Sequence, residues 1–293
     1  MRQGDRLIQG MAGNGDFRIL AADTTETVET ARRLQDLSPV AADALGRTLT
    51  ASILLARLLD KDVRNQYVTI RIEGDGPLGS VIAEANVSGG ARGFVANPVP
   101  EQDGSLDVVR AIGNGMLTVV RGTPPSGKPY TSQLQLGGGG VAEELTRYLL
   151  RSEQIASAVL LGVLNRREGV AAAGGIVVQA FPHASSESIG TIEERIREAP
   201  PLSTLIEKMP IEDVVAQMFH GVGYKQIDAS FNVPIAYRCT CSRERALGTL
   251  TLFSGEELRQ MIEQGGSDIT CQYCGRRYSF TRDELTALAR GRN

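Results

Sequence analysis

Apolar residues recur at helical spacing along the segment SPVAADALGRTLTASILLARLL. They occupy Val40, Ala44, Leu45, Leu49, Leu55 and Leu58. Ser38 precedes the first of them and suits an N-cap, and Pro39 suits the first helical turn, where its missing N–H costs nothing. The pattern therefore predicts a long helix that begins after Ser38. A shorter helix is predicted before it, at residues 25–36.

Alternation with a period of two follows this helix and predicts strands. QYVTIRIE alternates, GDGP supplies a tight turn and GSVIAEAN returns, which predicts a hairpin. VAEELTRYLLRSEQ predicts a further helix, and GVAAAGGIVVQAF predicts a buried strand rich in glycine. Other strands are predicted at residues 91–96, 116–121 and 131–136. The mixture predicts an α+β core domain, with sheet and helix together, over residues 1–179.

Residues 180–234 have a different pattern, with short amphipathic helices interrupted by proline and glycine. Thr191 and Glu194 have the spacing of a capping box, which would begin the helix TIEERIREA. Pro210 precedes a second helix, IEDVVAQMFH, and GVGYKQIDASFNVP shows no clear periodicity. Helices this short are marginal alone. We therefore expect a helical linker whose apolar faces lie on a sheet of the first domain.

Residues 235–293 form a third region with two further capping-box patterns. Ser254 with Glu257 opens GEELRQMIEQ, and Thr281 with Glu284 opens RDELTALAR. All the cysteines of the chain lie here, in two local pairs: Cys239, Cys241, Cys271 and Cys274.

Four thiolates in two pairs, joined by one loop and a helix, suit a tetrahedral zinc site. A region this small has a meagre core, and a bound structural zinc ion adds roughly 10–16 kcal/mol of apparent binding free energy to folding. We therefore predict a small C-terminal domain that binds one zinc ion per chain through these cysteines. A disulfide sulfur lacks the thiolate charge that zinc needs, so oxidation and zinc binding are competing states. The chemistry therefore permits a redox switch, in which the same cysteines either bind zinc or form disulfides.

Composition narrows the classes of function. The chain is 42% hydrophobic and 22% charged, as ordinary globular proteins are. A net charge of −3, with 5% aromatic residues and no tryptophan, does not favour a nucleic-acid binder. The N-terminal segment has no apolar stretch typical of a signal peptide, and ASAVLLGVL is too short to span a bilayer. We expect a cytoplasmic protein without membrane contact, in a compartment that keeps thiols reduced.

Two other classes of function remain open for the cysteines. A zinc-ribbon nucleic-acid-binding protein is possible because Arg276 and Arg277 lie beside the second pair. Against it, residues 235–293 are only slightly basic, with nine Lys and Arg against seven Asp and Glu, and ribbon knuckles more usually pair two Cys-x-x-Cys motifs. A thiol oxidoreductase would need Cys-x-x-Cys at a helix N-terminus in a thioredoxin-like setting, whereas TCQYCGRRYSF indicates a knuckle that turns into a strand.

The motifs resemble a known family over essentially the whole chain, the redox-regulated holdase chaperones called heat-shock protein 33. CTCSRERALGTL and CQYCGRRYSF, with GEELRQMIEQGG between them, match its signature. EGDGPLGSVIAEAN, ARGFVANP, YLLRSEQIASAVLLGV and AAAGGIVVQAFP resemble its first domain.

The resemblance implies that the reduced chain holds zinc on its four cysteines and is inactive. Peroxide or hypochlorite, usually with heat, would form the disulfides Cys239–Cys241 and Cys271–Cys274 and release the metal. The small domain and the linker would then unfold, and apolar surface would bind unfolding client proteins without ATP. The active form in this family is a homodimer built through the first domain, and its members are not enzymes.

Overall fold

The computed structural model describes residues 4–59, 63, 65–100, 107–124, 128–227 and 233–290. The chain has an α+β fold and forms two compact units, Met1–Arg238 and Cys239–Asn293. Among the described residues, no helix has both the length and the apolar character needed to cross a membrane.

The first unit contains two antiparallel-rich sheets. One has the strand order β10-β1-β2-β9-β8, and β11 also pairs with β1. Its strands are β1 (Arg6–Ala12), β2 (Phe17–Asp23), β8 (Ser157–Arg166), β9 (Gly169–Ala180), β10 (Lys225–Gln226) and β11 (Val233–Pro234). The other has the order β12-β5-β4-β3-β6-β7. Its strands are β3 (Tyr67–Gly74), β4 (Ser80–Asn86), β5 (Gly90–Val95), β6 (Gly115–Gly122), β7 (Tyr130–Gln135) and β12 (Ala236–Tyr237). We call them the first and second sheet.

Helix α2 (Pro39–Ala56) lies between the two sheets and forms the centre of the main core. The Ser38 hydroxyl accepts a hydrogen bond from the Ala41 amide at 3.4 Å, which confirms the predicted N-cap. Other helices of this layer are α1 (Thr25–Gln35), α3 (Val108–Ile112) and α4 (Val141–Ser152). The hairpin of β3 and β4 pairs Tyr67 with Asn86 and Glu73 with Ser80, as the alternation predicted.

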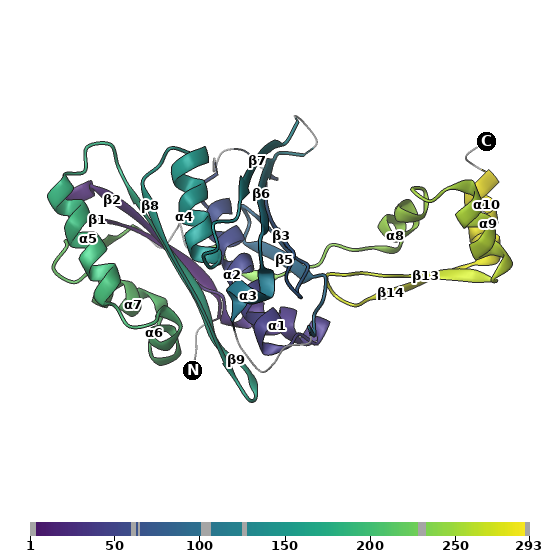
Figure 1. Ribbon diagram of the computed structural model, residues 1–293, viewed down its shortest axis with the longest axis horizontal. Coiled ribbons are helices and arrows are strands. Elements are labelled where there is room, and N and C mark those ends of the chain that lie inside the picture. Colours follow the sequence, from purple (N-terminus) through teal and green to yellow (C-terminus); the bar gives the residue numbers. More distant parts are fainter. Residues whose placement is uncertain are drawn as a thin grey trace. The chain divides into compact units, whose positions relative to one another are not determined.

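Three short helices cover the opposite face of the first sheet (Figure 1). They are α5 (Ser186–Glu198), α6 (Leu202–Lys208) and α7 (Ile211–Met218). The expectation that the linker helices lie on a sheet of the first domain is confirmed. The capping box predicted at Thr191 and Glu194 is wrong. The N-cap of helix α5 is Ser185, six residues earlier, because the Ser185 hydroxyl accepts from the Ser188 amide at 3.1 Å, and the Thr191 hydroxyl donates to the Glu187 carbonyl inside the helix.

The stretch without periodicity, GVGYKQIDASFNVP, contributes the two-residue strands β10 and β11, while residues 228–232 lie outside the described part.

The second unit has its own small core. It consists of α8 (Arg243–Leu250), α9 (Gly255–Glu263), the hairpin of β13 (Gly266–Thr270) and β14 (Arg277–Thr281), and α10 (Arg282–Arg290). The buried apolar residues are Ala246, Leu250, Leu258, Phe280 and Leu285.

Both predicted capping boxes of the second unit are present. The Ser254 hydroxyl accepts from the Glu257 amide at 3.2 Å, while the Glu257 carboxylate accepts from the Ser254 amide at 2.7 Å. Thr281 and Glu284 form the same reciprocal pair, at 3.4 and 2.8 Å. These local bonds fix where α9 and α10 begin.

Candidate functional site

The four cysteine sulfurs converge in the second unit, where every Sγ atom lies within 4.8 Å of the others. Cys239 Sγ is 3.6 Å from Cys271 Sγ, and Cys241 Sγ is 3.5 Å from Cys274 Sγ. All four are free thiols and are partly buried. The two sequence pairs therefore form one cluster.

A hairpin turn positions Cys271 and Cys274. Cys271 follows β13, and its amide donates to the Arg276 carbonyl at 2.9 Å. The Gly275 amide returns a 2.8 Å bond to the Cys271 carbonyl. Gly275 has a φ of +69°, in the left-handed region where glycine avoids the steric cost of a side chain. The turn thus curls the chain so that both thiols point toward one place.

The other pair precedes helix α8 and is fixed from that helix. The Ser242 hydroxyl accepts from the Arg245 amide at 3.3 Å and forms the N-cap. The Arg245 guanidinium donates to the Thr240 carbonyl at 2.8 Å and to its hydroxyl at 2.7 Å. Thr240 lies between Cys239 and Cys241, so this clamp holds the short Cys-x-Cys segment.

Burial and hydrogen bonding shift the pKa values of three of the four thiols in the cluster. Burial raises the pKa of Cys239 to about 12 and also raises the pKa of Cys274. Burial opposes ionisation of Cys241 too, yet hydrogen bonds from the Tyr278 hydroxyl, at 3.2 Å, and from the other thiols lower its pKa to about 7. Metal ligands must be deprotonated, so a cation would be needed to keep four thiolates together.

The donor set and its spacing fit a zinc ion. Tetrahedral coordination with Zn–S bonds of about 2.3 Å separates the sulfurs by about 3.8 Å. The two measured separations, 3.5 and 3.6 Å, are close to this value. Thiolates are soft ligands that select zinc over the hard cations magnesium and calcium. Cys239, Cys241, Cys271 and Cys274 could therefore hold one zinc ion.

Some neighbours of the cluster were not predicted. Tyr278 lies on β14, and no motif in the sequence indicates that its hydroxyl contacts a cysteine. Arg243 stacks over the Phe280 ring, 4.6 Å from its centroid, and pairs with Glu284 at 2.6 Å. The candidate phosphate contact Arg277 is instead paired with Asp268 on the neighbouring strand. Since Cys271 and Cys274 sit in a β-hairpin, this unit lacks the helix N-terminus that the oxidoreductase hypothesis needs there.

The linker helices form a second functional feature, in the first unit. Ile192, Ile206 and Val215 are buried against the first sheet with other apolar residues of both layers. Helix α6 packs against two glycines of the first sheet, Gly162 on β8 and Gly174 on β9. A β-carbon on Gly162 would lie 2.8 Å from the Ser203 nitrogen, and one on Gly174 would clash with Ile206 Cδ1. The sheet is therefore shaped to let α6 approach its backbone.

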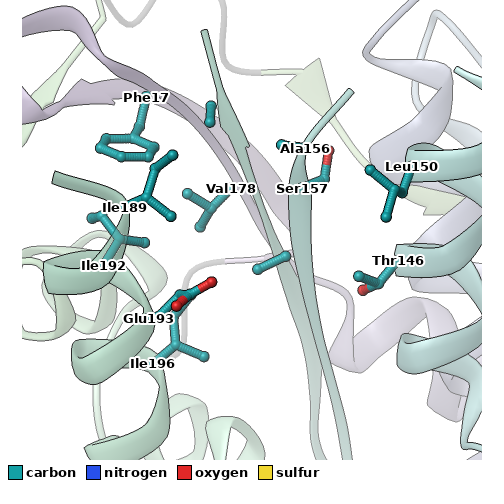
Figure 2. A pocket seen from close by; sticks show the side chains of 12 residues that line it. Phe17, Thr146, Leu150, Ala156, Ser157, Val178, Ile189, Ile192, Glu193 and Ile196 are labelled. Carbon is teal, nitrogen blue, oxygen red and sulfur yellow. The ribbon is translucent and has the colours of Figure 1, made fainter. Parts of the chain in front are cut away.

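The packing of helix α5 is less complete. A cavity of about 190 Å³ lies between α5, the first sheet and α4 (Figure 2). Its walls are mostly apolar and include Phe17, Leu150, Val178, Ile189 and Ile192, while Glu193 lies at the same opening. Unfilled volume removes van der Waals contacts, so α5 is held less tightly than a fully packed helix.

Known proteins agree with this arrangement. A family profile described as Hsp33 protein matches residues 5–281. A 33 kDa chaperonin of Thermus thermophilus is 42% identical, covering 97% of this chain and 86% of its own. One of Deinococcus radiodurans is 38% identical, covering 97% and 98%. The crystal structure of the 33 kDa chaperonin (heat shock protein 33 homolog) of Thermotoga maritima has a TM-score of 0.89 and 33% identity, and the match covers 99% of both chains.

Proposed function

The chain belongs to the Hsp33 family and is a chaperone, and from this premise we propose that it is an ATP-independent holdase switched on by oxidation. The convergence of four Sγ atoms within 4.8 Å is the observation that carries the proposal. In the reduced state, Cys239, Cys241, Cys271 and Cys274 hold one zinc ion and keep the second unit folded. We further propose that the chain acts in the cytoplasm, has no enzymatic role, and binds clients as a homodimer.

Activation is a two-electron oxidation at each cysteine pair. Each pair, Cys239 with Cys241 and Cys271 with Cys274, loses two electrons to one peroxide molecule as its S–S bond forms. The zinc-bound thiolates carry no protons, so two protons from solvent convert the peroxide oxygens to two water molecules, and Zn²⁺ is released. The products can no longer supply thiolate ligands. The small core of the second unit supports the next step, because five buried apolar residues give little stability without a staple.

Release of the linker follows in this proposal. Arg238 joins the first unit directly to Cys239, so unfolding of the second unit removes the ordered anchor at the end of the linker region. The linker helices cover an apolar face of the first sheet, including Ile8, Phe17, Ile19 and Val178. Exposure of that face and of the helices' own apolar sides would provide surface for unfolding clients. Binding delays aggregation and needs no nucleotide.

The test measures zinc per chain and suppression of aggregation, before and after peroxide. We expect one zinc and no suppression in the reduced chain, then loss of zinc together with strong suppression. Cys241→Ser should lose zinc and suppress aggregation without oxidant, whereas Ser267→Ala, in the same unit but outside the cluster, should behave as wild type. Suppression that stays the same with zinc bound or lost would overturn the proposal.

Hydrogen exchange separates the linker step from the metal step. We expect the amides of residues 190–220 to be protected in the reduced chain and to exchange rapidly after oxidation. Protection that persists in the oxidised chain would contradict linker release, even if zinc were lost.

The alternative function is nucleic-acid binding by the zinc unit. Its support is the presence of Arg276 and Arg277 beside the cluster, and its weakness is that Arg277 is already paired with Asp268. A gel shift with mixed oligonucleotides at two salt concentrations tests it, because phosphate contacts weaken steeply as salt rises.

A further inference from the structure

Strand β12 covers one edge of the second sheet with very few bonds. It pairs with β5 in parallel, Ala236 opposite Gly90 and Tyr237 opposite Ala91. The Ala236 amide donates to the Gly89 carbonyl at 3.1 Å, and the Arg238 amide donates to the Ala91 carbonyl at 2.7 Å. Cys239 comes next and begins the second unit. Pairing by backbone therefore ends at Ala91, although β5 continues to Val95.

A side chain then continues the pairing where the backbone of β12 has ended. The Tyr237 hydroxyl donates to the Gly93 carbonyl at 2.9 Å and lies 3.5 Å from the Gly93 amide nitrogen, in position to accept from it. Gln35 of α1 donates to the same carbonyl at 2.9 Å. In an antiparallel sheet, alternate residues of an edge strand direct both backbone groups outward. Ala91 and Gly93 belong to this outward set. At Gly93, the side chains of Tyr237 and Gln35 make hydrogen bonds that a longer β12 would make through its backbone.

The edge beneath this cover is suited to an extended chain. β5 spans Gly90–Val95, which corresponds to about 20 Å of extended backbone. Its sequence GARGFV contains no proline, so every residue of the strand keeps its backbone amide for pairing. Uncovered strand edges are templates for pairing with other chains. Such pairing uses main-chain groups and therefore tolerates many sequences.

We propose that the outer edge of β5 is an acceptor site for an extended segment of an unfolded client, opened when residues 236–238 leave it. The inference rests on the proposed function and names a client-binding surface for it. The present occupant indicates the kind of partner, because β12 is itself an extended segment held through backbone groups and one hydroxyl. Its position immediately before Cys239 ties the cover to the unit that oxidation unfolds.

Amide exchange followed by NMR on the full-length chain tests the site residue by residue. We expect the outward amides of Ala91 and Gly93 to exchange at least ten-fold faster after oxidation. They should regain protection when reduced, carboxymethylated lactalbumin, a permanently unfolded protein, is added. The Arg92 and Phe94 amides belong to the alternate set that faces β4, so they are the internal control and should stay slow throughout.

The outcomes distinguish this inference from the proposed function. If anisotropy shows no binding of the probe to the oxidised chain, the holdase itself is wrong. If the probe binds while Ala91 and Gly93 remain fast, the strand-acceptor site is wrong and the holdase stands. If these amides become protected without a probe, in proportion to protein concentration, a second copy occupies the edge and the client site is overturned.

A conservative variant weakens the cover without changing the cluster. Tyr237→Phe removes the hydroxyl that bridges to Gly93, and one net hydrogen bond corresponds to about a five-fold change in an opening equilibrium. We expect Gly93 exchange in the reduced, zinc-loaded chain to quicken by about that factor, with a rise in probe binding. Tyr130→Phe, on the opposite edge strand β7, is the matched control and should change neither. Unchanged exchange in Tyr237→Phe would contradict the role given to this hydroxyl.

Discussion

Arg6 on β1 and Glu212 on α7 form a two-bond ion pair across the junction between the first sheet and the linker. Arg6 Nε donates to Glu212 Oε1 at 2.6 Å, and Nη2 donates to Oε2 at 2.5 Å. The side chains are only 15% and 29% exposed. Although burial opposes ionisation of Glu212, the hydrogen bonds from Arg6 hold its pKa below the usual value. The ion pair therefore holds α7 against β1 through two charge-assisted hydrogen bonds, in addition to the apolar packing of the helix on the sheet.

Replacing Glu212 with glutamine should loosen α7. The variant loses charge-assisted bonds at a half-buried site, which corresponds to about 1–3 kcal/mol of linker docking. We expect faster amide exchange over residues 211–218 in the reduced chain and activation at a lower peroxide dose. Glu207→Gln is the control: its partner Arg166 is 56% exposed, and exposed pairs contribute little. Equal effects of the two variants would show that the Arg6 pair has no special role.

Tyr278→Phe should weaken zinc binding without unfolding the reduced unit. The phenol donates to Cys241 Sγ at 3.2 Å, and loss of such supporting bonds around a metal site typically costs about ten-fold or more in affinity. Competition with a chromogenic chelator measures the change. Thr286→Ala on α10, away from the cluster, should leave the affinity unaltered. An affinity equal to wild type would mean that the tyrosine only fills space.

Filling the cavity beneath α5 should make the chain harder to activate. Ala158 on β8 lines this cavity, and Ala158→Val adds two methyl groups with a side chain that strands favour. We expect about 0.5–1 kcal/mol of added docking stability, as for other cavity-filling changes. Exchange over residues 186–198 should slow, and suppression of aggregation should need more oxidant. Faster exchange would show that the valine overpacks the site.

Stability of the first unit should fall as pH rises from 5 to 7, through Asp5. Burial raises the pKa of Asp5 to about 6, despite its hydrogen bonds from the Glu26 and Thr27 amides, and nearby Asp23 adds to the increase. A carboxyl group with a raised folded-state pKa stabilises the fold when protonated. That stabilisation is complete below the unfolded-state pKa, near 3.8, and is lost as pH passes 6.

Denaturant unfolding at several pH values measures this contribution. The slope attributable to Asp5 should amount to at most about 3 kcal/mol between pH 4 and 7. Asp5→Asn should remove that part of the slope while keeping an oxygen to accept one amide bond. An unchanged slope in the variant would assign the effect to other carboxyl groups.

Helix caps and the tight hairpin were predictable from the sequence, because residues close together in the chain determine them. Ser38 caps α2, Ser254 caps α9, and the β3–β4 hairpin follows its turn, because each depends on residues a few positions apart. The cysteine cluster was also predictable, since four thiols in two tight pairs have few other uses in a reducing compartment.

Features decided by docking were not predictable in the same way. Strands β1, β2 and β8 were not predicted, and β10, β11 and β12 are two residues long, so their conformation comes from the strand edge they meet. The wrong helix start at Thr191 has a related cause: Ser185 offered an earlier cap, and packing of Ile189 and Ile192 on the sheet carried the helix through Gly190. The pairing of Tyr237 with Gly93 joins residues 144 positions apart, which no local pattern reveals.

Gly162 and Gly174 leave α6 no room to turn in place. A helix that packs through long side chains can rotate or translate in small steps. Ser203 and Ile206 instead pack directly against the glycine backbone of the sheet. Tightly packed elements shift between discrete positions instead of deforming smoothly. Individual molecules should consequently be found seated or lifted, with few caught in between, and a graded response of the population would reflect changing proportions of the two.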